Sequence, residues 1–184
     1  MKIRIALTSF ATLALVVCTG LELSAASAPH GNVRLRAALR GLNEVPPTAS
    51  LATATLQAVL DKSTSTITFS LAYQNLTANP TAAHLHFGPT KVNGGVITFL
   101  CGGGSKPACP EATSGTITGT ITPADIIGPV AQGIAPGGFA AVVRAIETGN
   151  SYTNMHDANF RDGEIRGQIF ATDGGRPDDE DADD

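Results

Sequence analysis

A chain of 184 residues is long enough for one domain with a sizeable hydrophobic core, and its sequence shows no internal repeat. The formal net charge of −4 comes from one end, because residues 178–184 hold six acids, whereas residues 29–177 carry ten Lys/Arg and nine Asp/Glu. The nearly neutral body has no basic stripe, and this argues against a nucleic-acid-binding protein.

The first 28 residues have the pattern of a secretory signal peptide. Lys2 and Arg4 give a positive start, residues 5–17 are apolar, and small residues follow. The apolar run is too short to span a membrane. We therefore expect a secreted or periplasmic protein without a transmembrane segment.

The end of this signal segment leaves two points open. Cleavage after Ala26 and cleavage after Ala28 both fit the small-residue spacing. A lipid anchor at Cys18 is the less favoured outcome, because Val17 is bulky where a small residue is needed.

Residues 29–172 alternate apolar and polar side chains with the period of two that is typical of β-strands. The strands are separated by turn-forming residues, and three pairs are predicted to form hairpins: residues 53–60 with 66–73, residues 83–87 with 96–100, and residues 152–156 with 164–170. The predicted strands are residues 33–39, 53–60, 66–73, 83–87, 96–100, 115–121, 152–156 and 164–170.

Two segments depart from this alternation. Residues 139–146 place apolar side chains at i, i+3, i+4 and i+7, which predicts a short amphipathic helix that ends before Gly149. Thr122 followed by Pro123 favours the start of another helical turn. We expect a mainly β fold, a Greek-key β-sandwich or barrel of about eight to nine strands with one short helix, followed by a disordered acidic tail at residues 173–184.

Two cysteines remain once the signal is removed. In an exported chain Cys101 and Cys109 are most simply paired in a disulfide, which closes the glycine-rich loop between them. The alternative, a two-cysteine metal clip, lacks partner cysteines and nearby histidines.

Three of the four histidines of the chain lie in two short segments. His84 and His86 share one face of a predicted strand, and His156 ends another. If the two strands are neighbours, three imidazoles converge in a set that suits copper, and less well zinc. The alternative is that these histidines only hydrogen-bond to the backbone or to each other. Candidate groups around such a site are Asp157 and Glu164, which could orient an imidazole, and Arg166, which could steer an anion; each could equally be a strand or turn charge.

A series of short motifs occurs in order along the chain, at residues 35–39, 43–47, 82–88, 152–156 and 163–169. Together they resemble the CHRD domain, a family named after repeats of the extracellular growth-factor antagonist chordin. The resemblance covers nearly all of residues 32–170 and implies an extracellular or periplasmic β-sandwich module that binds an unknown extracellular protein or matrix partner, with no settled chemistry.

A fainter similarity is to copper-zinc superoxide dismutases. That family also has a Greek-key barrel, a His-x-His strand that binds copper and a later copper-binding histidine followed by an acid, in the order of His84, His86 and His156-Asp157. The chain offers no candidates for the zinc ligands or the bridging histidine of that family. Two hypotheses follow: an exported CHRD-type binding module with a three-histidine copper site, and a copper-only oxidoreductase. An enzyme needs an open metal position, whereas a structural site is closed by a fourth protein ligand.

Overall fold

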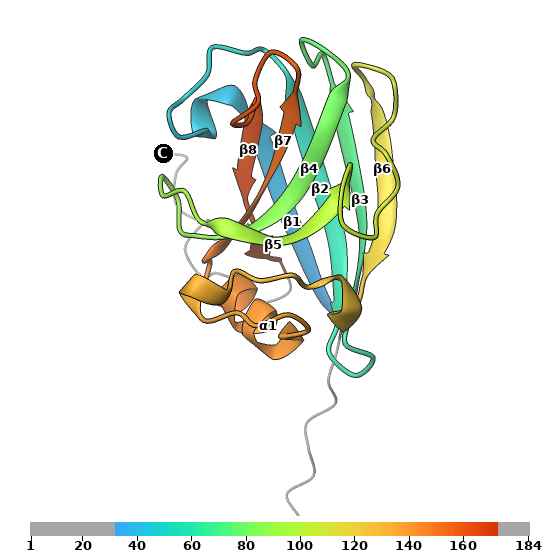
Figure 1. Ribbon diagram of the computed structural model, residues 1–184, viewed down its shortest axis with the longest axis vertical. Helices are drawn as coiled ribbons and strands as arrows, with labels where there is room; N and C mark the ends of the chain where they lie inside the picture. The colour runs from blue at the N-terminus through green and yellow to red at the C-terminus, as the bar shows by residue number, and fades with distance from the viewer. Residues whose placement is uncertain (1–31, 173–184) are drawn as a thin grey trace, which may run out of the picture.

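Nine strands within residues 32–172, the part of the chain that the computed structural model describes, form one antiparallel sheet that curls into a nearly closed barrel (Figure 1). Each of the predicted strands is present, and the last one is divided in two. This confirms the mainly β prediction, and of the two predicted arrangements the strands adopt the barrel. The strands are β1 Val33–Arg40, β2 Thr53–Asp61, β3 Thr66–Gln74, β4 Pro80–Phe87, β5 Gly95–Cys101, β6 Gly115–Ile121, β7 Ser151–Asp157, β8 Ile165–Gln168 and β9 Phe170–Ala171.

The order of the strands around the barrel brings distant parts of the sequence together. It runs β5-β4-β7-β8-β1-β2-β3-β6, and the two-residue strand β9 pairs with β1 beside β8. The first and last strands are therefore neighbours. The predicted hairpins β2–β3, β4–β5 and β7–β8 are confirmed by their antiparallel pairing.

The alternation of side chains accounts for the core of the barrel. In β1 the apolar side chains Leu35, Ala37 and Leu39 face inward, while Arg34 and Arg36 lie on the outer face. The same alternation in the other strands fills the interior with leucine and isoleucine side chains, which favour burial and pack without polar atoms.

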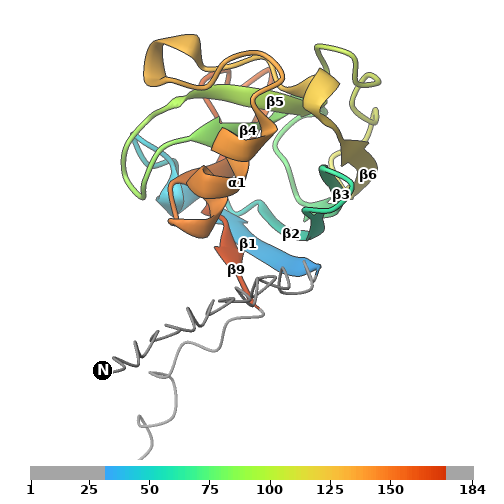
Figure 2. The ribbon, with the colours of Figure 1, turned by 90° about the horizontal axis from the view of Figure 1, so that it is seen from below.

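The predicted helix is α1, Phe139–Glu147, and it covers one end of the barrel (Figure 2). Its buried residues are Phe139, Val142, Ala145 and Ile146, on one face as the spacing requires. Thr148 caps the helix, and Gly149 follows in the left-handed conformation (φ +69°) that glycine adopts without a steric cost. The remaining helical turns are of the 3₁₀ type: η1 Gly41–Asn43, η2 Pro123–Asp125 and η3 Val130–Gln132.

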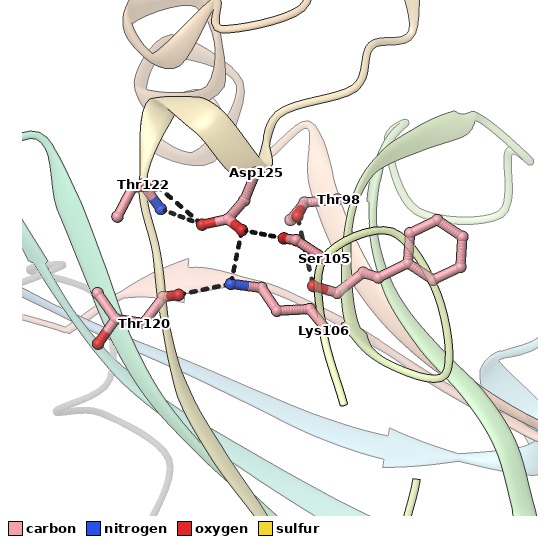
Figure 3. Close-up of polar contacts among 7 residues, drawn as sticks. Thr98, Ser105, Lys106, Thr120, Thr122 and Asp125 are labelled. Carbon is pink, nitrogen blue, oxygen red and sulfur yellow. Dashed lines mark hydrogen bonds and ion pairs between the residues drawn. The ribbon is translucent and has the colours of Figure 1, made fainter. Parts of the chain in front are cut away.

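The barrel has a seam between β5 and β6, which approach each other without forming a ladder. The disulfide between Cys101 and Cys109, confirmed as predicted, closes the loop that starts at the end of β5. Lys106 in this loop donates from Nζ to the backbone carbonyl of Thr120 on β6 (2.6 Å) and forms an ion pair with Asp125 (2.9 Å; Figure 3). A lysine thus takes one of the edge acceptors that a neighbouring strand would otherwise bond.

Asp125 also completes the start of η2. Its carboxylate accepts from the backbone N–H and the hydroxyl of Thr122 (2.8 and 2.9 Å), the capping arrangement expected for Thr122 before Pro123 (Figure 3). The predicted signal peptide (residues 1–28) and acidic tail (residues 173–184) lie outside the described residues. Among residues 32–172 no helix is long and apolar enough to cross a membrane.

Candidate metal centre

Strand β4 carries two of the three histidines on the outer face of the barrel. Ala83 and Leu85 belong to the hydrophobic core, so His84 and His86 project to the opposite side, as the period of two predicts. The segment after β4, residues 88–94, folds back over this face. His86 is only 8% exposed beneath it.

Strand β7 lies directly beside β4, which meets the condition on which the metal hypothesis depended. In the register of this pair His84 lies opposite Asn154, His86 opposite Tyr152, and Ala82 opposite His156. His156 therefore lies diagonally across from His84, and their ring centroids are 4.8 Å apart. One potential ligand atom from each of His84, His86 and His156 lies within 4.8 Å of the other two.

Backbone hydrogen bonds fix which ring nitrogens are free to bind a metal. Nδ1 of His86 is 2.9 Å from the Gly94 carbonyl, and Nδ1 of His156 is 2.9 Å from the Arg161 carbonyl. A carbonyl can only accept, so both Nδ1 atoms carry the proton and both Nε2 atoms present a lone pair. Nε2 of His86 is buried and has no hydrogen-bond partner in the described part of the chain.

The third imidazole completes the set through its other nitrogen. Nδ1 of His84 lies 3.1 Å from Nε2 of His156. Without a metal the two nitrogens share one hydrogen bond, with His84 as donor. With a metal both would act as ligands, since tetrahedral bonds of about 2.1 Å require nitrogens roughly 3.4 Å apart. The His84–His156 pair is therefore already close to metal-binding geometry.

Burial keeps the imidazoles neutral. It lowers the pKa of His84 to about 3, with smaller effects of His156 and His86 in the same direction, and it lowers the pKa of His86 to about 4. Burial also lowers the pKa of His156, although its hydrogen bond to the Arg161 carbonyl and the charge of Asp162 oppose the shift. Neutral imidazole is the form that binds a metal, so the cluster need not lose protons near pH 7 to do so.

A stack of side chains holds His86 from one side. Its ring is parallel to that of Tyr152 (5° between planes, centroids 4.7 Å apart), and the guanidinium of Arg166 lies 3.4 Å from the Tyr152 centroid. The hydroxyl of Tyr152 accepts from the N–H of Gly94, whose carbonyl receives the His86 proton. The orientation of His86 is thereby fixed by packing and by the backbone.

Arg166 does not face solvent, because it is 2% exposed. It donates to the carbonyls of Pro89 (3.0 Å) and Val92 (2.9 Å) and to the amide oxygen of Asn93 (3.2 Å). In this position Arg166 fastens the segment that covers the histidines, and a role in steering anions from the surface does not fit its burial.

The two predicted carboxylates hold loops. Asp157 accepts from the hydroxyl of Thr77 and from three backbone N–H groups, and Glu164 accepts from the hydroxyl of Ser50 and the N–H of Thr77. Within residues 32–172 neither carboxylate hydrogen-bonds an imidazole; the carbonyls of Gly94 and Arg161 do this instead. The charge of Asp157 nevertheless acts on His156 and opposes the lowering of its pKa.

Asn154 is the residue of the site that the sequence interpretation missed. It lies on the same face of β7 as Tyr152 and His156 and opposite His84 across the ladder, and it is 3% exposed. The signal was present, because the alternation that joins His84 with His86 also joins Asn154 with His156.

The fold and the site together define a class: an antiparallel β-barrel with one disulfide-closed loop and a three-imidazole cluster on its outer face. The family model of the CHRD domain matches residues 35–169, and the chain belongs to this family. No curated protein and no solved structure matches the chain. The chain is thus a member of a family of binding modules.

Proposed function

We propose that this protein is an exported CHRD-domain binding module of the cell envelope or extracellular space that holds one copper ion on His84, His86 and His156. The disulfide supports the location, since such bonds persist in oxidising compartments. The binding partner would be an extracellular protein or matrix component, as the family suggests.

The observation that carries the metal site is the convergence of three imidazole nitrogens, two of which present a lone pair while the third, Nδ1 of His84, would present one in the other tautomer of that ring. Nε2 of His86 is buried without a partner, and Nε2 of His156 and Nδ1 of His84 lie 3.1 Å apart beside it. A buried nitrogen acceptor without a partner is costly, and a bound metal would remove that cost. Copper is preferred over zinc because imidazole sites bind Cu²⁺ more tightly along the Irving–Williams series.

Titration of the purified, metal-stripped protein with Cu²⁺ and with Zn²⁺ tests this proposal, read by calorimetry and by electron spin resonance of copper. We expect one equivalent of copper with nitrogen ligation, and binding about 100-fold weaker or more in the His84→Ala/His86→Ala double variant.

His30→Ala is the matched control, because it removes the remaining histidine of the chain. It should bind copper as the wild type does. Absence of copper binding by the wild type, or equal binding by the double variant, would refute the metal site and leave a binding module whose histidines only pack and hydrogen-bond.

The copper-only oxidoreductase requires a metal position that substrate can reach. His84 and His156 are half-buried, and His86 is buried under the Gly94 carbonyl and the Tyr152 ring. This enclosure favours a site that holds a metal over one that turns over substrate. Superoxide turnover by the copper-loaded protein no faster than by free copper would support the binding module. Turnover far faster than by free copper would support the oxidoreductase.

A further inference from the structure

The strand register places the side chain of Asn154 in the middle of the histidine cluster. His84 is its cross-strand partner, and Tyr152 and His156 flank it two residues away on the same face of β7. His86 lies opposite Tyr152 and is therefore the diagonal neighbour of Asn154 across the ladder. The register thus places the amide next to two of the three imidazoles.

The oxygen of this amide has no hydrogen-bond partner among residues 32–172. Asn154 is 3% exposed, and its Oδ1 and the Nε2 of His86 are two of the four buried side-chain atoms without a partner in this part of the chain. Leaving a buried acceptor unpaired is energetically costly, so two such atoms from facing strands indicate a shared missing partner. A cation would satisfy both acceptors, because each presents a lone pair.

We infer that Asn154 supplies the fourth ligand of the metal centre through Oδ1, so that the chain closes a set of three imidazole nitrogens and one amide oxygen. The inference rests on the proposed metal site and goes beyond it, because it decides between an open and a closed centre. Four protein ligands leave no position for substrate, which is the arrangement of a structural site. The hard amide oxygen also favours a divalent ion over Cu⁺.

Replacement of the oxygen tests this ligand. Asn154→Leu keeps the approximate size of the side chain without the oxygen, Asn154→Ala is a second oxygen-free variant, and Asn154→Asp keeps an oxygen ligand. Each purified, metal-stripped protein is titrated with Co²⁺, whose visible spectrum reports coordination, and with Cu²⁺, read by spin resonance. Asn150→Leu is the matched control. Asn150 precedes β7, and its side-chain amide donates only to Thr148.

The expected result is binding roughly 10- to 100-fold weaker in Asn154→Leu and Asn154→Ala, with a changed cobalt spectrum, while Asn154→Asp and Asn150→Leu retain the four-coordinate spectrum. Circular dichroism of each metal-free variant verifies that the barrel has folded. Unchanged affinity and spectrum in both oxygen-free variants, with binding still lost in His84→Ala/His86→Ala, would overturn the fourth ligand and leave the three-histidine site standing. Failure of the wild type to bind any of these metals would overturn both.

Discussion

Glu44 is a buried acid that no imidazole or metal explains. It is 6% exposed, and its Oε1 has no hydrogen-bond partner in the described residues. Its carboxyl group packs against Gly163, where a Cβ would collide with it. Burial raises the pKa of Glu44 to about 7, although the positive charge of Arg166 acts in the opposite direction. The carboxyl group is therefore poised between its neutral and charged forms near neutral pH.

A stability measurement on Glu44→Gln should show this directly. The pKa is about 7 in the folded state and 4.5 for an ordinary glutamate, so the folded state binds more protons between these values. Stability from this group is then present at pH 4.5 and is lost as the pH rises to about 7, by at most about 3 kcal/mol. Urea unfolding at several pH values should show that loss in the wild type relative to Glu44→Gln.

Comparison of the two proteins is essential, because the lowered pKa values of the histidines act in the opposite sense. They make both proteins less stable as the pH falls below 6.5, and the difference between the two profiles cancels this effect. Parallel profiles for wild type and Glu44→Gln would contradict the raised pKa.

At the residue scale the sequence predicts ligand types better than it predicts what surrounds them. His84, His86 and His156 follow from residue chemistry and strand periodicity. The acceptors that orient them are backbone carbonyls of Gly94 and Arg161, and a carbonyl has no signature in a sequence because every residue has one. Residue chemistry therefore favours the acidic side chains of Asp157 and Glu164, whereas the loops of the folded chain place carbonyls in these positions.

At the scale of elements, one carboxylate joins the disulfide loop to η2 across the seam. Asp125 accepts from Ser105 Oγ (2.6 Å), from Lys106 Nζ (2.9 Å) and twice from Thr122 (Figure 3). Burial alone would raise the pKa of Asp125, but these hydrogen bonds outweigh it and hold the pKa well below its usual range. The ion pair is mostly shielded, with side-chain exposures of 12% for Lys106 and 11% for Asp125.

Asp125→Ala should destabilise the protein by about 2–4 kcal/mol. The substitution leaves the shielded ammonium of Lys106 with only the Thr120 carbonyl as acceptor. Since the folded pKa is lowered, the stabilisation is present above pH 3.8 and is lost as the pH falls below it. Ser105→Ala is the comparison variant and removes a single bond, for about 1 kcal/mol. Urea unfolding measures both, and a loss below about 0.5 kcal/mol in Asp125→Ala would show that the seam does not depend on this ion pair.

The sequence predicted the elements of the fold well and their partners less well. Hairpins such as β2–β3 are local, and turn residues between alternating strands identify them. The pairing of β4 with β7 joins residues about 70 positions apart, and no local pattern specifies such a contact. Burial of one face restricts this register, and the β4–β7 pair also has an irregularity between Pro80 and Ala82; both become visible only in three dimensions.

At the scale of the whole molecule, the loops around the barrel determine how far the site is buried. Arg166 from β8 holds the segment after β4 in place over His86, and the loop after β7 supplies the Arg161 carbonyl that bonds His156. The sequence predicts a sandwich or a barrel equally, since both bury one face of each strand. The folded-back segment shields imidazoles on a face of the barrel that would otherwise be exposed to water, and this shielding keeps them neutral.

The pairing of the first strand with the last one has a topological consequence. Thr172, just beyond β9, donates its N–H to the carbonyl of Arg34 near the start of β1 (2.8 Å), and the two strands run antiparallel (Figure 2). A linker of about four residues from Thr172 to Asn32 would therefore act as a hairpin turn. A circular permutant with new ends in the exposed turn between Asp61 and Thr66 should fold to the same barrel, as circular dichroism and copper titration would show. Loss of the fold on permutation would mean that contact between β1 and β9 is not sufficient. The order of the strands along the chain would then also be needed for folding.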